Sequence, residues 1–122
     1  MKKLRVLIVD DEEKDIEYAA SMLRKKGHEV MTAGDGQQGV LMAEQEQPDL
    51  ILMDVVMPVV NGFQATRQLS RNIATSNIPV IMLSCKDEET DKLWAIQQGA
   101  KGYLTKHVDK RDLFSTIEKI MN

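Results

Sequence analysis

Three aspartates, a serine and a lysine in this sequence could together perform phosphoryl chemistry. Each follows a short apolar run of the kind that forms a strand buried on both faces. The residues are Asp10, Asp11, Asp54, Ser84 and Lys106. Because the carboxyl ends of parallel strands meet at one edge of a sheet, we expect these side chains to converge there.

The charges of this set indicate which chemistry it supports. Three carboxylates in close proximity repel one another, by about 4 kcal/mol per pair at 4 Å and an effective dielectric constant near 20. Such a cluster calls for a cation, and oxygen ligands without cysteine or histidine favour Mg²⁺ over zinc. Mg²⁺ keeps coordination positions free for phosphate oxygens, to which Lys106 and Ser84 offer a positive charge and a hydroxyl. The set therefore predicts an aspartate that accepts a phosphoryl group.

Asp54 also has a simpler interpretation. A single aspartate at the end of a strand is often a helix cap or a loop acid, and a single lysine after a strand is usually solvated. An adjacent pair of aspartates and a third one, all following central strands, are harder to explain by capping. Capping and catalysis both remain open for Asp54 until its neighbours are placed.

The elements that must position these residues alternate along the chain. The expected strands are 4–9, 28–33, 51–53, 78–83 and 102–104. The expected helices are one that ends at Gly27, then 37–45, 63–71, 87–98 and 110–121. Asp109 is the expected N-cap of the last helix. Leu93 and Ile96 are expected to face inward from helix 87–98, and Ile73 to continue the apolar stripe of helix 63–71.

This alternation predicts an α/β fold, a doubly wound parallel sheet with helices on both faces. Periodicity alone does not determine the strand order. The expected five-stranded order is 2-1-3-4-5, which is flavodoxin-like and places the ligand crevice between the first and third strands.

Bulk properties limit the class of protein. The 122 residues fit one domain over residues 1–122, and a net charge of −3 gives no footprint for nucleic acid. The basic start is followed by only four apolar residues, and no run approaches the ~20 needed to span a membrane, so neither a signal peptide nor membrane insertion is expected. The one cysteine is compatible with a reducing cytosol, and a cytoplasmic location is expected.

The ordered motifs resemble the receiver domain of bacterial response regulators, the CheY-like fold. They are LIVDD at 7–11, MDVVMP followed by NG at 53–62, PVIMLS at 79–84 and YLTK at 103–106. The resemblance covers essentially the whole chain. Residues 61–70 and 86–92 are most similar to the PilH-like group of stand-alone twitching-motility regulators.

The resemblance implies a phosphoacceptor and a metal site. Asp54 would accept a phosphoryl group from a phosphohistidine on a histidine kinase or a histidine phosphotransfer domain. Mg²⁺ would be bound by Asp11, Asp54 and the backbone carbonyl of Val56, with Asp10 acting through a metal-bound water.

The resemblance also implies a switch. Ser84 would move toward the aspartyl phosphate, Lys106 would pair with it, and Tyr103 would swing inward to report the change. The fourth helix, fifth strand and fifth helix would then contact a downstream protein, in motility or chemotaxis-like signalling. The protein would be a regulator and not an enzyme. It would catalyse only its own phosphorylation and dephosphorylation. A phosphate sink for a shared kinase and a phosphorylation-independent interaction module are the alternatives.

Several residues depart from the family pattern. His107 replaces a proline that the family joins to the lysine by a cis bond, and a non-proline cis bond costs about 3 kcal/mol. We therefore expect a trans Lys106–His107 peptide and a solvated His107. Cys85 is expected to be a buried, inert thiol. Val56 and Lys86 flank the route of the attacking water and are expected to alter autodephosphorylation. Trp94 suits core packing and partner contact equally.

Two other functions are disfavoured. Gly34-x-Gly36-x-x-Gly39 follows a strand like a dinucleotide fingerprint, but its strand is short and edge-like, and this interpretation leaves the acids without a role. Gly36 and Gly39 are expected instead to allow the turn and close helix packing. Aspartyl-phosphate phosphohydrolases have a second acid two residues after the nucleophile, where this chain has Val56.

Overall fold

The structure is a computed structural model that describes residues 2–122. Its strands are β1 (Arg5–Val9), β2 (Glu29–Ala33), β3 (Leu50–Met53), β4 (Val80–Ser84) and β5 (Gly102–Thr105). Its helices are α1 (Glu13–Lys25), α2 (Gly36–Glu46), α3 (Gly62–Arg71), α4 (Glu89–Gln97) and α5 (Lys110–Met121). All strand pairs are parallel, in the order β2-β1-β3-β4-β5, which confirms the predicted doubly wound sheet.

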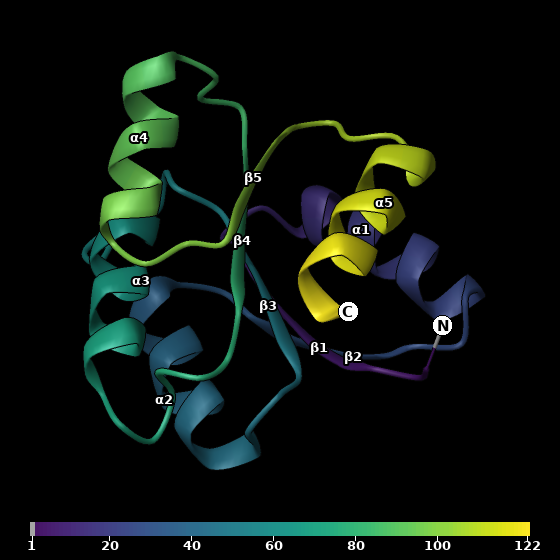
Figure 1. The fold of residues 1–122 in the computed structure, drawn as a ribbon, viewed down its shortest axis with the longest axis horizontal. Helices are drawn as coiled ribbons and strands as arrows, with labels where there is room; N and C mark the ends of the chain where they lie inside the picture. The colour runs from purple at the N-terminus through teal and green to yellow at the C-terminus, as the bar shows by residue number, and fades with distance from the viewer. Residues whose placement is uncertain (1) are drawn as a thin grey trace.

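Helices cover both faces of this sheet (Figure 1). Helices α1 and α5 lie on one face, and α2, α3 and α4 lie on the other. Alternate residues of the central strands feed two separate cores: Val6 and Ile8 belong to the core beneath α1 and α5, whereas Leu7 and Val9 belong to the core beneath α2, α3 and α4. This double burial is why the strands read as continuous apolar runs.

Local signals set two helix ends as predicted, and a third helix end has a cap that was not predicted. Gly27 follows α1 with φ of +90°, and Asp109 accepts the backbone N–H of Asp112 at the start of α5. Asn61 caps α3, because its side chain accepts the N–H of Gln64 and the Gln64 side chain accepts the N–H of Asn61. The residue that caps α3 is therefore Asn61, and Asp54 is not its cap.

The predicted inward face of α4 is wrong, and the buried apolar stripe of α3 stops before Ile73. Leu93 and Ile96 of α4 are each 61% exposed, and the residue that α4 buries is Ala95. Ile73 lies beyond the end of α3 and is 93% exposed. A helix of nine residues can seat on a small side chain, so its larger apolar residues remain outside.

Two glycines of the motif that resembles a dinucleotide fingerprint allow close packing. A side chain at Gly36 would overlap the backbone of Val60, and one at Gly39 would lie 2.7 Å from the side chain of Val9. Both glycines therefore let α2 approach its neighbours closely, as expected. Within residues 2–122, no helix is both long and apolar enough to cross a bilayer.

Candidate active site

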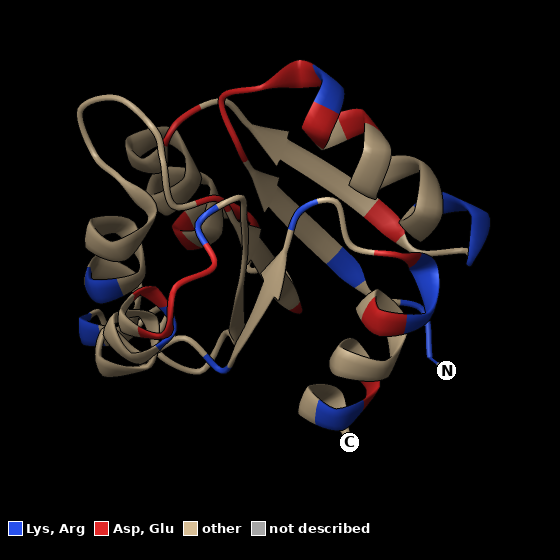
Figure 2. Cartoon of the chain, turned by 90° about the horizontal axis from the view of Figure 1, so that it is seen from above, with Lys and Arg blue, Asp and Glu red and all other residues tan. Residues whose placement is uncertain are grey.

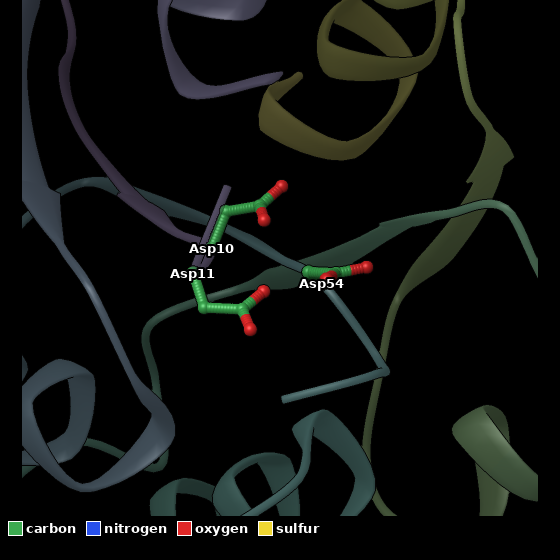
Figure 3. A group of neighbouring side chains, drawn as sticks. All are labelled: Asp10, Asp11 and Asp54. Atoms are coloured by element: carbon green, nitrogen blue, oxygen red, sulfur yellow. The ribbon is translucent and has the colours of Figure 1, made fainter. Parts of the chain in front are cut away.

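Three carboxylates gather at the carboxyl edge of the sheet, as predicted. Asp10 and Asp11 follow β1 and Asp54 follows β3, and in Figure 3 their carboxylates lie on the same side of these strand ends. One oxygen of each lies within 4.8 Å of one from each of the others. Asp10 and Asp54 are buried, whereas Asp11 is exposed. This hard-oxygen set, open to solvent on one side, fits Mg²⁺.

The backbone around Asp54 is held from two directions. Its N–H donates to the carbonyl of Val9 at 2.9 Å, which fixes it beside the end of β1. Gly62 packs so closely behind it that any side chain there would overlap the Asp54 carbonyl oxygen. Burial, with Asp10 adding repulsion, raises the pKa of Asp54 to about 6. In the absence of metal, burial and the charge of Asp10 thus destabilise the ionised form of Asp54.

Lys106 provides the positive charge of the site. Its Nζ lies 2.7 Å from Asp10 Oδ2, 2.8 Å from Asp15 Oδ2 and 3.5 Å from Asp54 Oδ1, and its side chain is 6% exposed. Burial by itself lowers the pKa of Lys106, but hydrogen bonds to Asp10 and Asp15 outweigh burial and raise it above its usual value. The ammonium is therefore charged and within reach of an anion on Asp54.

Asp15 is a residue of the site that sequence reasoning missed. It lies in the first turn of α1, and the ion pair with Lys106 holds its pKa below the usual value against the opposing effect of burial. Its other oxygen, Oδ1, lies 2.7 Å from His107 Nε2. An acid four residues after Asp11, at the start of a helix leaving the same sheet edge, was the available signal.

One prediction about the loop after β5 is wrong, because the Lys106–His107 peptide is cis rather than trans. His107 is an exposed loop residue, as expected. Its ring also contacts Asp15, and it packs edge-on against Tyr18 with ring centroids 5.3 Å apart.

Ser84 and Tyr103 lie on the neighbouring strands. Ser84 ends β4 fully buried, and its Oγ accepts the N–H of Lys86 at 3.3 Å. The Tyr103 hydroxyl donates to the Lys86 carbonyl at 2.6 Å. Burial and the charge of Asp91 raise the pKa of Tyr103 to about 12. The loop after Ser84 is thus tied to both residues of the predicted switch.

The remaining departures from the family pattern lie around the rim. Cys85 is exposed, so the expected buried thiol is wrong. Val56 is 61% exposed. A cavity of about 300 Å³ includes both Val56 and Lys86 in its lining. A larger cavity, about 710 Å³, is lined by residues 76–80 and Lys101 at the opposite edge of the sheet and by none of the predicted site residues.

The charge distribution matches a local site rather than a broad charged face. Figure 2 shows acidic stretches (red) beyond the arrowheads of strands, while basic residues (blue) are spread over several elements. A phosphate-bearing ligand would therefore be attracted by Lys106 and any bound cation, not by a basic surface.

Comparison with known proteins identifies the class that this fold and site define. The family model for the response regulator receiver domain matches residues 6–118. The chain belongs to this family, and it is a receiver domain of two-component signalling, a regulator rather than a catalytic enzyme. Its sequence is 52% identical over 117 residues to protein PilH of Pseudomonas aeruginosa, covering 96% of this chain and 97% of PilH. The predicted resemblance to the PilH-like group is thus confirmed.

Other relatives are longer, and solved structures agree with the fold. The transcriptional regulatory protein PhoP of Bacillus subtilis is 36% identical over 96% of this chain, which spans 48% of PhoP. Chemotaxis protein CheY4 of Vibrio cholerae superposes with a TM-score of 0.90 at 28% identity, covering 98% and 99% of the two chains. The receiver domain of sensor histidine kinase PA1611 from Pseudomonas aeruginosa, solved with magnesium in its active-site cleft, has a TM-score of 0.90 at 29% identity and covers 98% of each chain.

Proposed function

We propose that this receiver domain, spanning residues 1–122, accepts a phosphoryl group on Asp54 from a phosphohistidine of a histidine kinase or histidine phosphotransfer domain. The observation that carries the proposal is the placement of the buried Asp54 carboxylate next to an ammonium and two further acids. A buried carboxylate with a raised pKa, beside a cation, is poised for reaction rather than for structural support.

The transfer is a nucleophilic displacement at phosphorus. An oxygen of Asp54 attacks the phosphorus, the P–N bond of the phosphohistidine breaks, and the imidazole nitrogen keeps the electron pair and takes a proton from solvent. Lys106 stabilises negative charge on the transferred group because its ammonium is already buried at the site. Asp11, Asp54 and the carbonyl of Val56 would bind Mg²⁺, with Asp10 acting through water, and the ion would neutralise charge on the phosphoryl oxygens.

The switch would run from the phosphoryl group to the far side of β5. Ser84 would hydrogen-bond the phosphoryl oxygen, and Tyr103 would leave the Lys86 carbonyl and turn inward. This would bias two pre-existing arrangements of the α4–β5–α5 face. Leu93, Ile96 and the half-exposed Trp94 support that face as the docking surface for a downstream protein, because apolar side chains gather there on the outside of α4.

The 52% identity to PilH supports a role in pilus or twitching motility. A phosphate sink for a shared kinase is the runner-up. A phosphotransfer profile against candidate kinases distinguishes the two, because a sink discharges a kinase that also serves another regulator.

Acetyl phosphate labelling tests the phosphoacceptor. Wild type is expected to be labelled in Mg²⁺, and Asp54→Asn and Asp54→Ala to lose labelling while their circular dichroism spectra stay unchanged. Asp112→Asn, an exposed acid in the first turn of α5, is the matched control and should label normally. Undiminished labelling of Asp54→Ala would refute the assignment, and an unlabelled wild type would favour the phosphorylation-independent module.

A further inference from the structure

One ammonium serves three carboxylates in this site, and they do not share it equally. Lys106 Nζ is 2.7 Å from Asp10 and 2.8 Å from Asp15, which are distances of direct charge-assisted hydrogen bonds. Its 3.5 Å separation from Asp54 Oδ1 is longer than such bonds. Asp15 therefore holds Lys106 more closely than the proposed phosphoacceptor does.

Asp15 is itself fixed by the loop that follows Lys106. His107 Nε2 lies 2.7 Å from the Asp15 oxygen that Lys106 does not use, and the Asp15 side chain is only 19% exposed. The His107 ring contacts Tyr18 edge-on at 75°, and the Tyr18 hydroxyl donates to the Val108 carbonyl at 3.0 Å. Helix α1 and the β5–α5 loop thus keep the Asp15 carboxylate on Lys106.

We propose that Asp15 is a positioning residue that competes with a phosphoryl group on Asp54 for the ammonium of Lys106. The proposal deepens, and rests on, the proposed function. Asp15 is not one of the three clustered carboxylates Asp10, Asp11 and Asp54, and the family resemblance assigns it no role. Its negative charge, 2.8 Å from the ammonium, offsets the attraction of the ammonium for phosphoryl oxygens and restrains the movement of Lys106 toward them.

Beryllofluoride, a mimic of the phosphoryl group, tests the competition. Asp15→Asn keeps the side-chain shape and removes the charge. Its affinity for beryllofluoride, followed by amide chemical shifts at a Mg²⁺ concentration that saturates each variant, should rise roughly five- to tenfold over wild type. Glu13→Gln removes an exposed acid of the same helical turn and should stay within about twofold. Equal or weaker binding by Asp15→Asn would overturn the proposal.

A metal-free measurement separates this proposal from the proposed function. In crystal structures of wild type and Asp15→Asn grown with a chelator, the distance from Lys106 Nζ to Asp54 Oδ1 should shorten in the variant from 3.5 Å to about 3 Å or less. An unchanged distance would also overturn the role of Asp15. If wild type binds no beryllofluoride, the proposed function fails, and this distance alone decides whether Asp15 positions Lys106.

Discussion

The ammonium of Lys106 lies 3.5 Å from Oδ1 of Asp54, and both residues lie at the carboxyl edge of the sheet. β5 and β3 deliver the two residues, and β4 lies between these strands. The pairing therefore depends on the strand order as much as on the residues. A second set of contacts, from α1, decides how far the ammonium can follow a new charge on Asp54.

Removing the charge of Lys106 should slow phosphorylation. We expect Lys106→Met to lower the rate of acetyl phosphate labelling by about tenfold or more, because a preorganised charge at the site of developing negative charge is lost. Lys101→Met, at the opposite edge of the sheet, is the control and should label at the wild-type rate. Wild-type labelling by Lys106→Met would show that the ammonium stabilises nothing in the transfer.

Asp54 should make the metal-free protein less stable as the pH rises. Its pKa is about 6 in the fold against 3.8 without it, so the folded chain binds this proton more tightly than the unfolded chain does. The contribution of Asp54 to the free energy of unfolding therefore decreases as the pH rises from 3.8 to about 6, and it stays low at higher pH. Asp54→Asn should be more stable than wild type by roughly 2 kcal/mol at about pH 7.5.

Urea unfolding in the presence of a chelator measures this difference. The gap between Asp54→Asn and wild type should narrow as the pH is lowered from about 6 towards 4. Asp112→Asn controls for removing an acid elsewhere. A gap that does not change with pH would contradict the buried, repelled carboxylate.

Gly62 should not tolerate a side chain. The Cβ of Gly62→Ala would overlap the carbonyl oxygen of Asp54 and would lie 2.8 Å from Val55 Cα. Both of these atoms belong to the backbone and cannot easily move away. We expect a loss of about 2 kcal/mol or more in the free energy of unfolding. Labelling should also be slower, because Asp54 must shift. Gly34→Ala, whose Cβ would meet only Gln38 Oε1 at 3.8 Å, should change stability by less than about 0.5 kcal/mol.

Val59 should be a site for stabilisation. It has φ of +67° and is 92% exposed, and the N–H of Val60 donates across it to the Pro58 carbonyl at 2.8 Å. A β-branched residue is strained there, by about 1–2 kcal/mol. Glycine removes the strain at an entropic cost of about 0.5–1 kcal/mol, so Val59→Gly should raise the free energy of unfolding by roughly 0.5–1 kcal/mol.

An equally exposed position provides the control for Val59. Ile73 is 93% exposed and is not among the described residues with positive φ. Ile73→Gly should therefore give no stabilisation in the same thermal or urea unfolding measurement. A loss of stability in Val59→Gly would contradict the strain at that turn.

The pattern of strands and the acids that follow them were predictable from the sequence. Continuous apolar runs require burial on both faces, and the right-handed crossovers between parallel strands bring their carboxyl ends to one edge. The sequence by itself therefore predicts that Asp10, Asp11 and Asp54 lie together. The motifs added the family, and the 52% identity to PilH agrees with it.

Side-chain direction and loop geometry were decided only by the tertiary structure. Whether Asp15 faces Lys106 depends on how α1 is rotated on the sheet, and whether Leu93 faces the core depends on which side of α4 can approach α3 and β5. The cis peptide at Lys106–His107 and the exposed Cys85 likewise belong to loops, where no repeating period constrains the chain. Periodicity says which residues share a face, but only the packing of elements distant in sequence determines what that face meets.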